Sequence, residues 1–231
     1  MLGERIAEAV QRHVARPGEQ VVGHVVHPDT IAVKTTGDTY FADPADWSIA
    51  GHPGVEAAYR VVVDGMMDNF VITYGLLAPA GGGEVLLLNE LAVLRDLPRR
   101  LGAPVEPLAY AELLAELCSG PALDQPVVRP MAATTRHRAG WLIRDVAQLR
   151  ERYPEVDPDL VAPPVVRADP PAAEFYSHNY VLHHAVSGLG IYRWTVELPP
   201  DGPARWERQV VVAELPVRPW LHQGPGADPT G

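Results

Sequence analysis

Alternating apolar and polar positions predict a β-hairpin near the centre of the first half of the chain. Residues 60–63 and 70–77 are rich in β-branched and aromatic side chains, which is typical of strands. Asp64-Gly65 and Asp68-Asn69 lie between them and readily adopt the left-handed conformations of a tight reversal. Arg60 opens the first strand and requires an anionic partner. That partner is either a protein carboxylate at the rim of the sheet or a bound ligand.

A second hairpin is predicted over residues 174–198. A two-residue turn at Gly188-Leu189 would pair His184 with Arg193, and strand side chains alternate between the two faces. The predicted core face carries Val181, Ala185, Tyr192, Trp194, Val196 and Leu198. The opposite face carries His178, Tyr180, Leu182, His184, Arg193, Thr195 and Glu197. This polar face is either the floor of a ligand site or a solvated sheet surface with cross-strand pairs.

The remaining periodic segments predict four helices and four further strands. Apolar residues at helical spacing indicate helices over residues 2–15, 91–101, 108–117 and 141–153. Strands are expected over 20–26, 30–35, 84–88 and 206–215, with a short helical turn at 43–47. Hairpins and segregated helices together predict one α+β domain, a twisted antiparallel sheet with helices packed on one side.

Two segments lack the pattern of a packed core. Residues 119–170 are proline-rich at both ends, and we interpret them as an insertion or lid within a single domain spanning 1–231. Residues 217–231 are rich in proline and glycine and are expected to fray.

Composition narrows the classes of function. The formal charge of −10 argues against tracking of nucleic-acid phosphates, which requires basic clusters. Cys118 is the single cysteine, which fits a reducing compartment, and we expect it to be a core residue. The sequence has no secretory signal pattern and no apolar run long enough to span a membrane. We therefore expect a soluble cytoplasmic protein, and its oligomeric state stays open.

No metal or organic cofactor is expected. The sequence shows no cluster of His, Cys and Asp with ligand spacing. Gly81-Gly82-Gly83 is not followed by Gly-Lys-Ser/Thr or by a helix, so it predicts a hairpin turn and not a phosphate-binding loop.

The order of these elements resembles the chorismate lyase-like family, which includes the effector-binding domains of GntR-type regulators. The family pattern has an arginine-led hairpin that ends in proline, which matches residues 60–79 here. A Pro-Leu-Gly-like segment before a helix corresponds to Leu101-Gly102 and Pro107-Leu108. A closing hairpin with Ser-Gly at its turn and an acidic residue before Leu-Pro corresponds to Ser187-Gly188 and Glu197-Leu198-Pro199. The match covers most of the chain apart from residues 119–170.

The resemblance implies a closed small-molecule pocket between a sheet and helices. It implies that Arg60 binds a substrate carboxylate, and Leu108 is a further candidate for substrate binding. The family's acidic position falls on Thr195, and Glu197 lies two residues further along the same strand face. The basic residues that the lyases carry at the start of the closing hairpin are replaced by His178-Asn179-Tyr180, which departs from the pattern for chorismate.

Three functions follow as alternatives. The first is a cofactor-independent lyase acting on chorismate or a similar small anion, with Glu197, His184 and His178 as catalytic groups. Its substrate-binding residues would be Arg60, Arg193, Tyr180, Thr195 and Leu108. The second is an elimination or ring closure in natural-product biosynthesis, and the third is a non-enzymatic effector-binding domain. All three predict that Arg60 and the polar hairpin face meet across one pocket.

Overall fold

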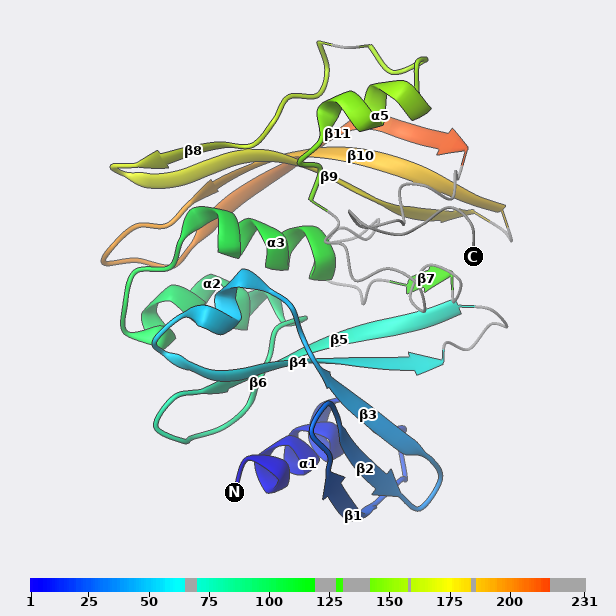
Figure 1. The fold of residues 1–231 in the computed structure, drawn as a ribbon, viewed down its shortest axis with the longest axis vertical. Helices are drawn as coiled ribbons and strands as arrows, with labels where there is room; N and C mark the ends of the chain where they lie inside the picture. The colour runs from blue at the N-terminus through cyan, green and yellow to red at the C-terminus, as the bar shows by residue number, and fades with distance from the viewer. Residues whose placement is uncertain (65–69, 119–127, 131–141, 158, 184–185, 217–231) are drawn as a thin grey trace.

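The computed structural model describes residues 1–64, 70–118, 128–130, 142–157, 159–183 and 186–216, which form two antiparallel sheets and several helices (Figure 1). The α+β class predicted from the sequence is confirmed. Within these residues, no helix is long and apolar enough to cross a membrane.

The first sheet contains both strands of the arginine-led hairpin. Its strand order is β1-β2-β3-β4-β5-β6, and β7 also pairs with β5. The strands are β1 (Val21–Val26), β2 (Ile31–Thr35), β3 (Thr39–Pro44), β4 (Val55–Asp64), β5 (Phe70–Pro79), β6 (Leu86–Leu87) and β7 (Val128–Pro130). Arg60 pairs with Gly75 across the hairpin. The turn itself lies outside the described residues.

The second sheet contains the closing hairpin, in the order β11-β10-β9-β8. The strands are β8 (Val165–Ala168), β9 (Pro171–His183), β10 (Val186–Glu197) and β11 (Arg205–Pro216). His183 pairs with Val186, and Arg193 pairs with Tyr176. The predicted pairing of His184 with Arg193 is therefore wrong, because the chain reverses earlier than Gly188-Leu189.

Helices separate and flank the sheets, so the molecule is layered (Figure 1). Helix α1 (Leu2–His13) packs on the face of the first sheet that carries Val61 and Leu76. Helices α2 (Leu91–Leu101) and α3 (Pro107–Leu117) lie between the sheets. Helix α5 (Val146–Arg152) covers the outer face of the second sheet.

The layering corrects the expectation of helices on one side of a single sheet. Helical periodicity shows that a helix has an apolar face but does not show which sheet face it covers. Helix α3 is buried on nearly every side because a sheet lies above and below it. Its short apolar side chains fill the space between Leu77 of the first sheet and Trp194 of the second.

Two local expectations are also revised. Residues 43–47 were expected to form a helical turn, but strand β3 continues through Pro44 and a 3₁₀ helix, η1 (Ser48–Gly51), follows. Segment 119–170, interpreted as an insertion or lid, supplies strand β7 to the first sheet, strand β8 to the second and helix α5 to its outer face. Its other stretches, and residues 217–231, lie largely outside the described residues.

Candidate functional site

Arg60 projects from β4 towards α3 and is held by protein carboxylates. Its Nε donates to Oε1 of Glu116 at 2.6 Å, and its Nη2 donates to Oε2 of the same carboxylate at 3.0 Å. Nη2 also donates to Asp46 at 3.1 Å, and the guanidinium carbon lies 5.2 Å from the centre of the Trp47 ring. Trp47 Nε1 completes the cluster by donating to Glu116 at 2.6 Å.

Among the described residues, the carboxylates of this cluster outnumber the guanidinium groups. One guanidinium faces two carboxylates, those of Glu116 and Asp46, and the Glu116 side chain is only 3% exposed. Burial alone would lower the pKa of Arg60, but the Glu116 carboxylate and then Asp46 raise it, and the net shift is upward. Arg60 is therefore a charged structural bridge that already has the anionic partner its strand position requires.

Glu112, one helical turn before Glu116 in α3, also connects this helix to other segments. Glu112 accepts a 2.9 Å hydrogen bond from the backbone nitrogen of Ser48 in η1. It also forms an ion pair with Arg144, which precedes α5. Glu112 and Glu116 thus link the central helix to segments associated with both sheets.

The polar residues of β10 project away from this cluster. Tyr192, Trp194 and Val196 belong to the core around α3, so the alternating residues Arg193 and Thr195 point to the opposite face. Glu197 follows on the same outer face, and all three are exposed. Arg193 pairs there with Glu174 of β9 at 2.8 Å. Around Arg193, Thr195 and Glu197 this face is exposed and carries a cross-strand ion pair, whereas α5 covers it elsewhere.

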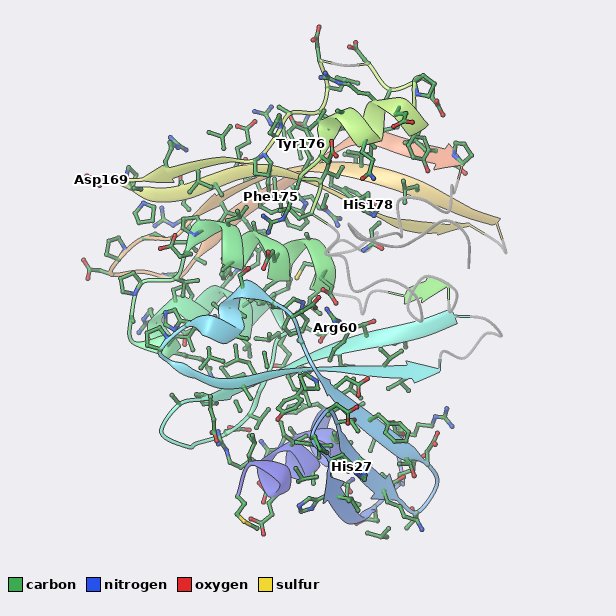
Figure 2. All side chains as sticks on the ribbon, viewed as in Figure 1. His27, Arg60, Asp169, Phe175, Tyr176 and His178 are labelled. Carbon is green, nitrogen blue, oxygen red and sulfur yellow. The ribbon has the colours of Figure 1, made fainter. Side chains whose placement is uncertain are left out.

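The other predicted site residues are dispersed. His178 is buried on β9, in the second sheet, whereas Arg60 is in the first (Figure 2). Leu108 is half-buried against the core around α3. The side chain of Tyr180 and residue His184 lie outside the described part of the chain. The structure therefore does not bring Arg60 together with Arg193, Thr195 and Glu197 in one pocket.

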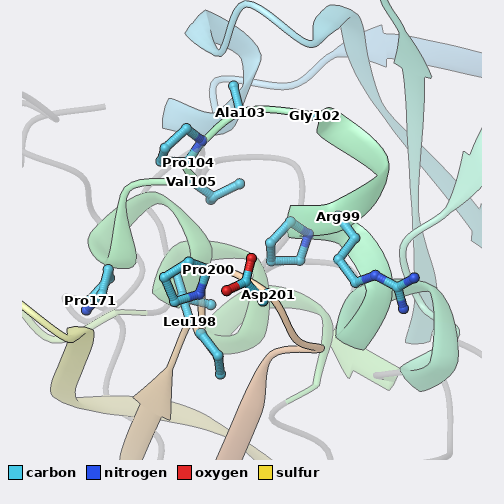
Figure 3. A pocket seen from close by; sticks show the side chains of 11 residues that line it. Arg99, Gly102, Ala103, Pro104, Val105, Pro171, Leu198, Pro200 and Asp201 are labelled. Carbon is cyan, nitrogen blue, oxygen red and sulfur yellow. The ribbon is translucent and has the colours of Figure 1, made fainter.

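A different cavity, with a volume of about 550 Å³, lies where the C-terminal end of α2 meets the second sheet (Figure 3). It is formed by the last turn of α2, the α2–α3 loop, the start of β9 and the β10–β11 connection. The lining residues are Pro98, Arg99, Gly102, Ala103, Pro104, Val105, Pro171, Leu198, Pro199, Pro200 and Asp201. We call this cavity the proline-walled pocket.

The α2 wall of the pocket tolerates a proline because another residue replaces the lost hydrogen bond. Pro98 lies inside α2 and has no N–H to donate to the carbonyl of Leu94, four residues earlier. The buried hydroxyl of Tyr110 donates to that carbonyl at 2.8 Å. The helix therefore continues to Leu101 and presents the Pro98 ring to the pocket.

The loops that form the other walls are also fixed by hydrogen bonds. His52 accepts from Gly54 N at Nδ1, so its Nε2 carries the hydrogen that it donates to the Pro104 carbonyl at 3.1 Å. In the β10–β11 connection, Leu198 N donates to Pro171 O and Ala204 N donates to Arg95 O. Proline rings and anchored backbone make the pocket preformed.

Sequence reasoning missed this pocket although a signal was present. Prolines cluster at Pro170-Pro171 and Pro199-Pro200, and Gly102-Ala103-Pro104 separates two predicted helices. Each cluster marks a loop when considered alone. Only the fold shows that these three loops converge on one cavity.

Metal binding finds no support in the described residues, since no group of three or more His, Cys, Asp or Glu side chains is arranged to hold an ion. Comparison with known protein families, curated proteins and solved structures gives no significant match.

Proposed function

We propose that this protein binds a small molecule in the proline-walled pocket and acts as a binding module, the third of the functions expected from the sequence. The observation that carries the proposal is the pocket itself. Its volume of about 550 Å³ lies within the range of small-molecule sites, and its walls are mainly apolar with two charged residues. Such walls bury the apolar body of a ligand while the charged groups select its ends.

Preorganisation supports the same proposal. Five of the lining residues are prolines, whose backbone φ angles are fixed by the ring. A ligand that enters such a site orders few protein torsions, so less of its binding free energy is lost to entropy.

Two observations favour binding over the lyase function. Arg60 already pairs with Glu116 and Asp46, so a ligand carboxylate at that guanidinium would lie beside two protein carboxylates. The histidine and arginine residues expected to act with it are exposed, or lie on another sheet, or are outside the described residues.

The experiment is a binding screen with a cavity-filling variant. A panel of neutral, cationic and anionic aromatic fragments would be tested by thermal shift and ligand-observed NMR. Ala103 lines the pocket, so Ala103→Trp should weaken each hit at least about tenfold by occupying its volume. Ala80→Trp introduces the same side chain at an exposed position outside the pocket and should leave affinity unchanged.

The proposal fails if no fragment binds, or if the hits bind Ala103→Trp as tightly as the unmodified protein. A circular dichroism spectrum that matches the unmodified protein would show that Ala103→Trp still folds.

A second candidate function is the elimination reaction on a chorismate-like substrate. The observation in its favour is that Arg60 Nη1 makes no hydrogen bond to another described residue, so it could still donate to a substrate carboxylate. Incubation with chorismate and measurement of released pyruvate tests it. Pyruvate release that depends on Arg60 would replace the binding-module proposal with the lyase.

A further inference from the structure

The proline-walled pocket has two lining residues of opposite charge that do not pair with each other. Arg99 extends from the end of α2, and Asp201 belongs to the β10–β11 connection (Figure 3). Arg99 Nη1 lies 3.2 Å from the Asp96 carboxylate, within its own helix. Asp201 forms no ion pair with any residue that the structure describes. The pocket therefore has one positive and one negative lining residue among apolar walls.

The turn of α2 that carries Arg99 keeps a net charge after its own pairing is counted. Asp96 forms ion pairs with two guanidinium groups, Arg99 at 3.2 Å and Arg100 at 3.1 Å. One carboxylate between two guanidinium groups leaves one positive charge on this turn of α2. Asp201 supplies one negative charge to the pocket.

We infer that the ligand is a small zwitterion with an apolar body, of the chemical class of a free aromatic or branched amino acid. This inference rests on the proposed function and names the ligand class for the same pocket. The ligand's carboxylate would face Arg99 and its ammonium group would face Asp201. Its apolar part would pack on the rings of Pro98, Pro104 and Pro200.

Charge complementarity selects this class over simpler ions. A plain anion would pair with Arg99 and leave Asp201 facing an apolar ligand, and a plain cation would do the reverse. Both residues are solvent-accessible, and the Arg99 side chain is 62% exposed. Exposed ion pairs are weak, so each charge should contribute only up to about fivefold in affinity. The pocket walls supply the rest by burying apolar area.

The test compares four probes that share a phenyl ring and differ in charge. They are L-phenylalanine, 2-phenylethylammonium, 3-phenylpropionate and 2-phenylethanol, titrated into the full chain and followed by ligand-observed NMR at low salt. The zwitterion should bind about threefold to fivefold more tightly than either single ion. Its advantage should shrink as salt is raised because exposed charges are screened.

Two variants assign each charge to its residue. Asp201→Asn should remove the advantage of L-phenylalanine over 3-phenylpropionate. Arg99→Gln should remove its advantage over 2-phenylethylammonium. Asp159→Asn and Arg167→Gln make the same changes at exposed positions outside the pocket and should alter neither ratio.

The outcomes separate this inference from the proposed function. The zwitterion inference would be overturned if the four probes bound with equal affinity. It would also be overturned if Asp201→Asn and Arg99→Gln left the affinity ratios between L-phenylalanine and the single ions unchanged. In either case the pocket would remain a binding site. The same holds if none of the four binds but other fragments bind and are lost in Ala103→Trp. If no compound of either panel binds, the proposed function itself fails.

Discussion

Arg60 of β4 and Glu116 of α3 form a two-point ion pair, with donor–acceptor distances of 2.6 and 3.0 Å, between the first sheet and the central helix. The two residues are 56 positions apart in the chain. Because the Glu116 side chain is 3% exposed, its charge needs protein partners, and this guanidinium and the Trp47 N–H are two of them. The pair therefore fixes the position of α3 against strand β4 of the first sheet.

Removing Arg60 alone should be strongly destabilising. Arg60→Met breaks the ion pair of a buried carboxylate, and the free energy of unfolding should fall by about 3–5 kcal/mol. Adding Glu116→Gln should recover most of that loss, because the side chain becomes neutral and can still accept from Trp47. Urea denaturation of the two variants measures both effects.

A matched control is available on the second sheet. Arg193→Met breaks an exposed pair with Glu174 that solvent screens, and it should leave the free energy of unfolding nearly unchanged. An Arg60→Met protein as stable as the unmodified chain would contradict the structural role and return Arg60 to the list of ligand-binding residues.

The hydrogen bond from Tyr110 to the Leu94 carbonyl predicts a coupling between Tyr110 and Pro98. Tyr110→Phe leaves a buried carbonyl unsatisfied and should cost about 1–3 kcal/mol. In a Pro98→Ala background the new backbone N–H can donate to Leu94, so the same Tyr110→Phe change should cost about 1 kcal/mol less. A double-mutant cycle from urea denaturation gives the coupling, and a value near zero would show that Tyr110 does not compensate for the proline.

Local patterns predicted the elements well. Helices α1, α2 and α3 and the hairpin of β4 and β5 were all expected, because hydrophobic spacing and turn residues are local signals. The alternation of β10 also predicted that Tyr192 and Trp194 face the core. The same alternation did not predict how β9 and β10 pair residue by residue. The predicted and observed registers both place odd-numbered residues of β10 opposite even-numbered residues of β9, so alternation could not distinguish them.

Long-range relationships could not be predicted from these signals. Nothing near Arg60 in the sequence indicates Glu116, and the burial of this glutamate is visible only once both sheets enclose α3. The pocket likewise depends on three loops distant in sequence. Its prolines indicate loops locally, and their convergence is a property of the fold.

Gly54 should be intolerant of any side chain. A Cβ at this position would lie 2.4 Å from the carbonyl oxygen of Leu101, a backbone atom at the end of α2. Gly54→Ala should therefore force a backbone shift and cost about 1–3 kcal/mol or more. Gly51→Ala is the control, since no heavy atom lies within 4 Å of its added Cβ. Thermal melting of both proteins checks this, and equal melting temperatures would contradict the close packing against Leu101.

Cys118 should be chemically silent in the native protein. It caps the end of α3 and is buried, and burial raises the pKa of its thiol to about 12. At pH 8 only about one molecule in ten thousand would carry the reactive thiolate. Ellman's reagent should therefore react slowly with the native chain and rapidly in denaturant. Rapid native labelling at pH 8 would contradict this burial.

The raised pKa of the Cys118 thiol should also make the folded protein less stable as the pH becomes alkaline. The folded thiol has a higher pKa than the unfolded one, so above about pH 9 the unfolded state releases a proton that the native state retains. The free energy of unfolding should then fall by up to about 1.4 kcal/mol per pH unit until about pH 12. Burial also raises the pKa of several tyrosines, Tyr110 among them, so the unmodified protein loses stability from these groups as well. Denaturation of Cys118→Ala across pH 8 to 11 isolates the thiol: its slope should be shallower than that of the unmodified chain, and identical slopes would show that Cys118 is not the group responsible.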